Sequence, residues 1–155
     1  VLYGFLDIDF KWVIKQELRK LPGIGIGCEK VGHIFIDRFD HESALKALST
    51  AKEKIVNGTS IIFFPEGTRS SDGIIRDFKK GAFKMALDLD LPILPVTIIG
   101  TKEILPNKTL NLFPGKALMK IHEPISVKDY SDENINELIK KAREIMVKDI
   151  SKEKN

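Results

Sequence analysis

Short apolar segments of the kind that form buried strands alternate along this chain with segments that have the apolar periodicity of helices. Strands are predicted at residues 10–14, 33–36, 60–64, 93–99 and 117–121. Helices are predicted at residues 16–21, 40–56, 78–89 and from Ser131 to about residue 150. This order favours the α/β class, with a mixed, largely parallel sheet flanked by helices.

The longer helical segments also carry capping signals. Asp40 is suited to the N-cap of the segment 40–56, and Gly58 follows its end. Its apolar positions share one helical face: Ala44, Leu45, Leu48, Ala51 and Ile55. Ser131 is expected to cap the last helix. The segment 23–27, Gly-Ile-Gly-Ile-Gly, is instead predicted to be an apolar, flexible loop.

The length and composition indicate one ordinary globular domain. With 155 residues the chain can bury a sizeable core, and we expect a single domain over residues 1–150 with a polar tail at 151–155. The net charge of +3 gives no indication of nucleic acid binding, while a pI of about 8.9 is compatible with an anionic ligand or a membrane surface. The single cysteine cannot form an internal disulfide, and no apolar run approaches the ~20 residues of a membrane span.

Residues 61–70 (Ile-Ile-Phe-Phe-Pro-Glu-Gly-Thr-Arg-Ser) are the strongest indication of a ligand site. A short apolar run ends in a charged turn that contains glycine, which is typical of a buried strand that delivers polar groups to the rim of a sheet. Open α/β sheets bind ligands at that rim, beyond the carboxyl ends of their strands. Glu66, Gly67, Thr68 and Arg69 are therefore candidate binding residues, and the alternative is a tight turn with a solvated ion pair.

Two further basic segments follow the same logic. Arg38 comes directly after a predicted strand, where its planar guanidinium can bind a phosphate or a carboxylate. Lys79 and Lys80 lie at the start of a predicted helix, whose free N–H groups attract anions. Taken singly, Arg38 and the lysine pair could each equally be solvated surface charges. Together, Arg38, Arg69 and Lys80 favour a ligand that carries phosphate.

The remaining motifs point to no chemistry. The glycines at 23–27 lack the spacing of a dinucleotide-binding loop and lead into a strand rather than a helix. His33, His41 and His122 have no metal-ligand spacing, so we expect no metal site. His33 and His122 border predicted strands and are expected to be structural.

At these motifs the chain resembles the glycerolipid acyltransferases, specifically the 1-acylglycerol-3-phosphate (lysophosphatidic acid) acyltransferases. Residues 32–38 (Gly-His-Ile-Phe-Ile-Asp-Arg) are similar to the second sequence block of that family, and 64–70 (Phe-Pro-Glu-Gly-Thr-Arg-Ser) to the third. Residues 78–83 resemble the segment after the third block, and 93–98 resemble the fourth. Order and spacing agree from about residue 11 to residue 124.

The resemblance implies a role for each matched residue. Arg38 would hold the phosphate of the acyl acceptor, and Glu66 with Gly67 would bind the glycerol phosphate part or shape its pocket. Pro95 and its neighbours would form an apolar wall near the acyl chain. The residues expected to bind the acceptor are Arg38, Glu66, Gly67, Thr68, Arg69 and Lys80.

The same resemblance implies the substrates and the location of the complete protein. The acceptor would be lysophosphatidic acid, and the co-substrate would be a fatty acyl thioester of acyl carrier protein or coenzyme A, with no cofactor. We expect the complete protein at the cytoplasmic face of a membrane. The apolar residues 21–27 are a hypothetical lipid-facing segment.

One family block has no match in this chain. It reads Asn-His, four residues, then Asp, and its histidine removes a proton from the attacking hydroxyl while the aspartate orients the ring. No Asn precedes His33, His41 or His122, and no Asp lies five residues after any of them. We therefore expect the block upstream of Val1. In that interpretation the chain is a truncated domain that lacks its first elements and does not turn over alone.

Two alternatives remain open from the sequence. The chain could be a phospholipid-binding module that has the phosphate-binding residues and no catalytic base. It could also be an unrelated α/β protein that binds phosphate, such as a sugar-phosphate enzyme.

Overall fold

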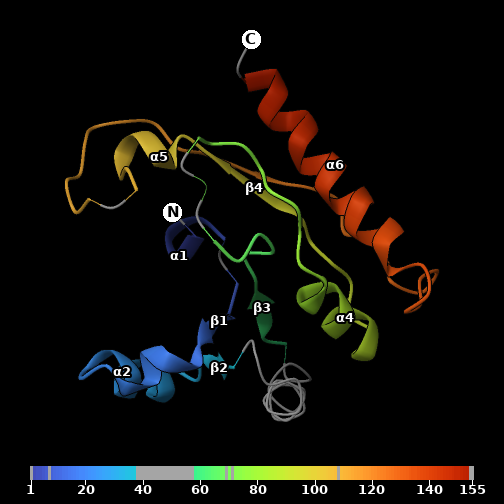
Figure 1. Ribbon diagram of the computed structural model, residues 1–155, viewed down its shortest axis with the longest axis horizontal. Coiled ribbons are helices and arrows are strands. Elements are labelled where there is room, and N and C mark those ends of the chain that lie inside the picture. Colours follow the sequence, from blue (N-terminus) through green and yellow to red (C-terminus); the bar gives the residue numbers. More distant parts are fainter. Residues whose placement is uncertain are drawn as a thin grey trace. The chain divides into compact units, whose positions relative to one another are not determined.

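The structure, a computed structural model, describes residues 2–6, 8–37, 58–68, 70, 72–107 and 109–153 (Figure 1). They belong to two compact units, which we call the N-terminal unit (Leu2–Phe63) and the C-terminal unit (Phe64–Asn155). Each unit is described by itself. The single domain predicted over residues 1–150 stays a prediction.

The N-terminal unit contains α1 (Leu2–Phe5), β1 (Phe10–Lys15), the 3₁₀-helix η1 (Gln16–Lys20), α2 (Ile24–Lys30), β2 (Ile34–Ile36) and β3 (Ser60–Ile62). The C-terminal unit contains α4 (Lys80–Asp88), β4 (Val96–Ile99), α5 (Thr101–Ile104), β5 (Leu118–Ile121) and α6 (Ile135–Glu153). None of the described helices is long and apolar enough to cross a membrane.

The strands of the N-terminal unit form a parallel sheet in the order β2-β1-β3. Residues 13–15 of β1 lie opposite β2, and residues 10–12 lie opposite β3. The carboxyl ends of β2 and β3 therefore flank β1 at one edge, with β2 reaching about three residues, or ~10 Å, further along it. Phe10, Ile34 and Ile36 are buried, as expected for apolar strands of a parallel sheet.

Asp9 aligns the start of β3 with β1. Its carbonyl oxygen accepts the Ser60 N–H at 2.8 Å. Its carboxylate accepts the Thr59 hydroxyl at 2.9 Å and pairs with Lys11 at 2.9 Å. The hydrogen bond from Lys11, followed by that from Thr59, lowers the pKa of Asp9 below its ordinary value.

The prediction of a flexible loop at residues 23–27 is wrong, because residues 24–27 form the first turn of α2. Gly25 is buried, and a Cβ at this position would lie 2.0 Å from the Arg19 carbonyl oxygen. The glycine therefore lets α2 pack closely on η1. An ion pair between Arg19 of η1 and Glu29 of α2 also joins the two helices. Ile24 and Ile26 are 53% and 64% exposed on this helix.

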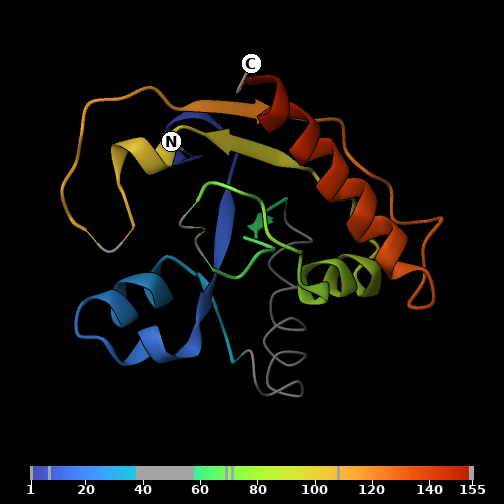
Figure 2. The ribbon, with the colours of Figure 1, turned by 45° about the horizontal axis from the view of Figure 1, so that its top comes forward.

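The C-terminal unit is built on an antiparallel pair, β4 with β5, which a bridge between Ile93 and Ile125 extends. The helices α4 and α6 pack against each other, and α6 also packs on β4 (Figure 2). Their shared core consists of Phe78, Phe83, Ile125, Val127, Ile135, Leu138 and Ala142. Together with the parallel sheet of the N-terminal unit, this pair confirms the predicted mixed, largely parallel α/β class.

Several element boundaries differ from the predictions. β3 ends at Ile62 rather than at residue 64, because the Phe64 carbonyl oxygen accepts a turn hydrogen bond from Gly67 instead of a strand partner. α4 begins at Lys80, because Lys79 is extended (φ −80°, ψ 142°) and its N–H donates to the Pro65 carbonyl oxygen. α6 begins at Ile135 and not directly after Ser131, whose hydroxyl accepts the Glu133 N–H within a local turn.

Two further differences concern the extent of the predictions. The short helices α1 and α5 carried no sequence signal that predicted them. The helix predicted at residues 40–56 lies outside the described residues.

Candidate functional site

The Pro-Glu-Gly turn that follows β3 is a hydrogen-bonded β-turn over residues 64–67. The Gly67 N–H donates to the Phe64 carbonyl oxygen at 3.0 Å. Proline at the second position and glycine at the fourth are what such a turn favours. Gly67 has φ +72°, a backbone conformation in which other residues are strained.

Lys79 covers Gly67 in the C-terminal unit. Its N–H donates to the Pro65 carbonyl oxygen at 2.8 Å. A Cβ at position 67 would lie 3.1 Å from Cε, 3.2 Å from Cδ and 3.4 Å from Nζ of Lys79. The missing side chain of Gly67 therefore leaves the space that the lysine side chain occupies, and its ammonium group lies beside the turn.

The Glu66 carboxylate contacts a backbone group within the C-terminal unit. Its Oε2 atom accepts the backbone N–H of Arg76 at 2.8 Å. Arg143 of α6 in turn donates to the carbonyl oxygens of Ile75, at 3.0 Å, and Arg76, at 3.3 Å. The carboxylate thus joins the turn to a segment that α6 holds in place.

The segment between Glu66 and α4 has its own local bonds. Asp72 accepts the Ile74 N–H at 3.1 Å and pairs with the Arg76 guanidinium at 2.7 Å. These groups, the Ile74 N–H first, lower the pKa of Asp72. The Ser70 hydroxyl accepts the Gly73 N–H at 3.1 Å. The described residues of the segment 64–79 therefore form a loop with defined backbone contacts, and we call this segment the phosphate loop after its predicted ligand.

The N-terminus of α4 follows this loop directly. Lys79 is its N-cap and provides no side-chain cap, and its first turn contains no acidic residue. The free N–H groups of such a turn favour an anion, and the positive end of the helix dipole adds to this. Lys80, the first helical residue, is exposed.

The other predicted site residues are only partly described. Arg38 and Arg69 lie outside the described residues. Thr68 is exposed beside the turn. Pro95 is buried next to β4, where its carbonyl oxygen accepts the His122 N–H at 3.1 Å. Within the C-terminal unit, Glu66, Gly67 and Lys80 thus belong to the phosphate loop and the helix that follows it, and Pro95 belongs to the β4–β5 pair.

His122 and Asp149 lie far apart in the sequence but meet in the fold. Nε2 of His122 lies 3.4 Å from Oδ2 of Asp149 and 2.9 Å from the hydroxyl of Thr97. In a catalytic triad the carboxylate and the nucleophile bond to different ring nitrogens, whereas here both face Nε2. The side chains of His122 and Asp149 are only 9% and 10% exposed. This buried cluster joins β4 and β5 to α6.

His33 also serves the fold. Its Nδ1 atom accepts the backbone N–H of Trp12 at 3.3 Å within the N-terminal unit. Nδ1 must be unprotonated to accept this hydrogen bond. Partial burial, with a smaller contribution from the charge of Lys11, lowers the pKa of His33. His41 lies outside the described residues.

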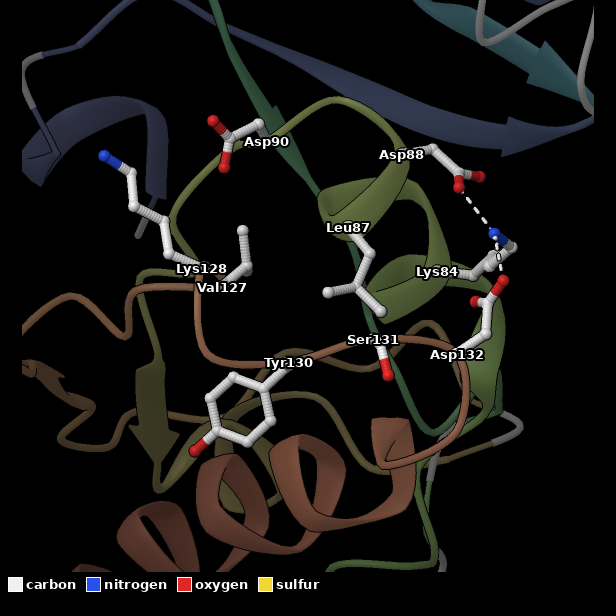
Figure 3. A pocket seen from close by; sticks show the side chains of 9 residues that line it. All are labelled: Lys84, Leu87, Asp88, Asp90, Val127, Lys128, Tyr130, Ser131 and Asp132. Atoms are coloured by element: carbon white, nitrogen blue, oxygen red, sulfur yellow. Dashed lines mark hydrogen bonds and ion pairs between the residues drawn. The ribbon is translucent and has the colours of Figure 1, made fainter.

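An open hollow of about 300 Å³ lies beside the carboxyl-terminal half of α4 (Figure 3). Lys84 bridges Asp88 and Asp132 at its rim, and these hydrogen bonds, the one donated to Asp88 first, raise the pKa of the lysine. No residue that lines the hollow belongs to the predicted site. The Lys84 ammonium group is already paired with carboxylates, and the lining contains Asp88, Asp90 and Asp132 against Lys84 and Lys128, so the hollow gives no support for an anion site.

Comparisons with known proteins bear on the sequence motifs. Residues 1–99 match the sequence model of the family described as Acyltransferase. A 1-acyl-sn-glycerol-3-phosphate acyltransferase of Chlamydomonas reinhardtii is 34% identical over 139 residues, covering 84% of this chain and 42% of that protein. Another, of Borreliella burgdorferi, is 35% identical over 139 residues, covering 84% and 54%. The chain thus spans about half the length of these relatives.

A solved structure agrees with these matches. The crystal structure of the 1-acyl-sn-glycerophosphate acyltransferase PlsC from Thermotoga maritima has a TM-score of 0.79 and 37% sequence identity to this chain. The similarity covers 99% of this chain and 60% of that one. The resemblance drawn from the four motifs is therefore confirmed.

Two contacts of the phosphate loop could not be predicted from the sequence. Lys79 was visible as half of a lysine pair, but only the fold shows that it covers Gly67. Arg143 carried no signal, because it lies in a helix more than sixty residues from the carbonyl groups it binds.

Proposed function

The chain belongs to the acyltransferase family, and from that premise we propose that the whole protein transfers a fatty acyl group to lysophosphatidic acid, giving phosphatidic acid for phospholipid biosynthesis. The names of its relatives support this acceptor. The observation that carries the proposal is the turn at residues 64–67, with the Lys79 side chain lying over Gly67 directly before the uncapped start of α4.

In this reaction the free hydroxyl oxygen of the acceptor attacks the thioester carbonyl carbon. The C–S bond breaks, the thiol leaves, and the proton of the hydroxyl is taken by a base. The residues of this chain bind and orient the acceptor. The base is the histidine of the Asn-His-x4-Asp block, which none of the three histidines of this chain matches.

Cations and backbone N–H groups hold the acceptor phosphate in this proposal. Arg38 supplies a bidentate guanidinium, and Arg69 and Lys80 add positive charge. Thr68 offers an exposed hydroxyl beside the turn. We assign Glu66 the task of shaping the pocket, because its Oε2 already accepts the Arg76 N–H.

Gly67 and Pro95 serve the shape of the site in the same proposal. Gly67 allows the close approach of the Lys79 side chain, which brings its ammonium group beside the turn. Pro95, buried next to β4, contributes an apolar wall near the acyl chain.

The donor in this proposal is a fatty acyl thioester of acyl carrier protein or coenzyme A, and no other cofactor takes part. Because the acceptor is a membrane lipid, we place the whole protein at the cytoplasmic face of a membrane. The exposed apolar residues Ile24 and Ile26 of α2 support a lipid-facing surface in the N-terminal unit.

Binding by the 155-residue chain tests the acceptor directly. Calorimetric titration with lysophosphatidic acid, below its micellar concentration, is expected to give a lower Kd than titration with a monoacylglycerol of the same chain length. Arg38→Ala is expected to raise the Kd about tenfold, because one charge-assisted phosphate contact is lost. Lys140→Ala, at an exposed α6 position, is the matched control and should leave the Kd unchanged. Equal binding of soluble sugar phosphates would contradict the proposal.

Turnover by the 155-residue chain tests where the catalytic base lies. The 155-residue chain is expected to show no acyl transfer from either thioester, and measurable transfer would overturn the assignment of the base to a missing block. The coding DNA upstream of Val1 distinguishes the enzyme from a binding module. An in-frame Asn-His-x4-Asp block supports the acyltransferase, whereas its absence favours a phospholipid-binding module.

A further inference from the structure

Residues 105–116, which we call the apolar loop, present large apolar side chains to solvent. Leu110 is 95% exposed, Leu112 73% and Phe113 51%. The loop connects α5 to β5, and in both ribbon views it extends away from α6, beyond the β4–β5 pair (Figures 1 and 2). Contiguous exposed apolar residues of this size mark contact surfaces on soluble domains.

The exposure belongs to a loop with defined contacts. The Phe113 N–H donates to the Ile104 carbonyl oxygen at 2.9 Å, and the Asn111 N–H donates to the Thr109 hydroxyl at 2.9 Å. A Cβ at Gly115 would lie 2.9 Å from Cγ1 of Ile104, so the glycine allows the chain to pass close to α5. The backbone is thus tied to α5 while its apolar side chains point outward.

The charge around this loop selects one kind of partner. The sequence from residue 104 to residue 122 contains lysines at 108, 116 and 120 and no Asp or Glu, and of these Lys120 pairs with Asp149 at 2.7 Å. Lys116 is exposed beside the loop, and α5 presents exposed Lys102 next to exposed Glu103. Apolar side chains bordered by lysines complement an anionic bilayer surface, where apolar burial and attraction to lipid phosphates add together.

The apolar loop also contacts the phosphate loop. The Asn107 side-chain amide donates to the Ser70 carbonyl oxygen at 3.2 Å. Ser70 ends the motif that carries Glu66, Gly67 and Thr68. A surface that binds the bilayer would therefore lie next to the residues that bind a lipid acceptor.

From these observations we propose that the apolar loop is a membrane-docking surface that inserts Leu110, Leu112 and Phe113 among the lipids of an anionic bilayer. The surface itself follows from exposure and charge. Its task, to bring the phosphate loop to a membrane-embedded acceptor, rests on the proposed function.

Vesicle co-sedimentation of the 155-residue chain tests this surface without any acceptor lipid. The wild-type chain is expected to bind phosphatidylcholine vesicles that contain about a third phosphatidylglycerol, and to bind less as salt rises. The triple variant Leu110→Ser, Leu112→Ser, Phe113→Ser is expected to bind about tenfold more weakly or worse. The matched control is Ile8→Ser with Val31→Ser, at apolar positions that are 44% and 54% exposed outside residues 21–27 and 105–116, and it should retain most of the binding.

A second measurement reports insertion of the loop itself. An environment-sensitive fluorophore on Leu112→Cys, in a Cys28→Ser background, is expected to shift to the blue on vesicles. The same label on Glu144→Cys, at an exposed α6 position, should not shift. These outcomes together support the docking surface.

Three results would overturn the inference. Wild-type binding that is absent, or unchanged in the triple variant, removes the surface. Loss of binding in a variant with Ile24→Ser and Ile26→Ser in α2, while the triple variant binds normally, moves the docking site to the N-terminal unit. A dimer in solution that the triple variant converts to a monomer, with vesicle binding unchanged, makes the loop an interface with a second copy.

The inference and the proposed function fail separately. If the chain binds vesicles through the loop but does not bind lysophosphatidic acid, the docking surface stands and the acceptor is wrong. If it binds lysophosphatidic acid and the triple variant binds vesicles normally, the acceptor stands and the docking surface is wrong.

Discussion

The phosphate loop and the apolar loop of the C-terminal unit use their side chains in opposite ways. In the phosphate loop, Glu66 and Asp72 accept backbone N–H groups, and Arg143 of α6 binds two of its carbonyl oxygens. In the apolar loop, the backbone is tied to α5 while Leu110 and Leu112 face solvent. The first loop uses charge to hold its own shape, and the second leaves apolar surface for a partner.

This difference separates two tasks that a lipid-modifying protein must perform. Recognition of a phosphate requires N–H groups and cations at defined positions, because a charge-assisted hydrogen bond depends strongly on geometry. Attachment to a bilayer requires apolar area and positive charge, which tolerate variation in position. Substitutions in the phosphate loop should therefore change folding stability, whereas those in the apolar loop should change partner binding.

The largest effect on folding is expected from Arg143→Ala. Its guanidinium bonds to the carbonyl oxygens of Ile75 and Arg76, and their loss should lower the free energy of unfolding by about 1–2 kcal/mol. Urea unfolding measures the change. Lys140→Ala on the same helix and Leu110→Ser in the apolar loop should each stay within about 0.5 kcal/mol of wild type. An equal loss in Leu110→Ser would break the contrast between the loops.

A smaller effect, with a control of opposite sign, is expected at two glycines. Gly67→Ala places a side chain at φ +72° and against Lys79, and should destabilise by about 1 kcal/mol. Gly81→Ala lies in α4 with nothing near its added Cβ, and should stabilise by about 0.5–1 kcal/mol. Thermal unfolding of both variants gives the signs. A stabilising Gly67→Ala would mean that the turn does not need its left-handed conformation.

The smallest effect is a pH dependence confined to the phosphate loop. The pKa of Asp72 is lowered from 3.8, chiefly by the Ile74 N–H and then by Arg76. A lowered folded-state pKa stabilises the fold above the unfolded value, and this contribution is lost as the pH falls below about 4. The protection factor of the Ile74 amide should therefore fall as the pH drops below about 4, and Asp72→Asn should remove that decrease. The described residues of the apolar loop include no carboxylate, so its amides should show no such step.

Local patterns predicted much of the fold and part of the site. The apolar runs at residues 10–14 and 33–36 became neighbouring parallel strands, and Pro65 with Gly67 predicted the turn after β3. Such features depend on residues a few positions apart, whose preferences survive in any fold. The four motifs likewise needed only order and spacing to indicate the family.

Where residues far apart in the sequence pack together, the local patterns gave a wrong prediction or none. The glycines at 23–27 predicted flexibility, but Gly25 is a helical residue whose missing side chain admits the Arg19 carbonyl oxygen. The pairing of His122 with Asp149 was equally invisible, because the two residues meet only once α6 packs on the β4–β5 pair.

The sequence by itself determined the α/β class, the parallel strands, the turn after β3 and the acyltransferase family, because each depends on local preference or on motif order. Only the tertiary structure decided that Lys79 covers Gly67, that Arg143 supports the segment bound by Glu66, and that the loop after α5 leaves its leucines in solvent. Those features arise from contacts between residues far apart in the chain, and no local preference specifies which distant groups will meet.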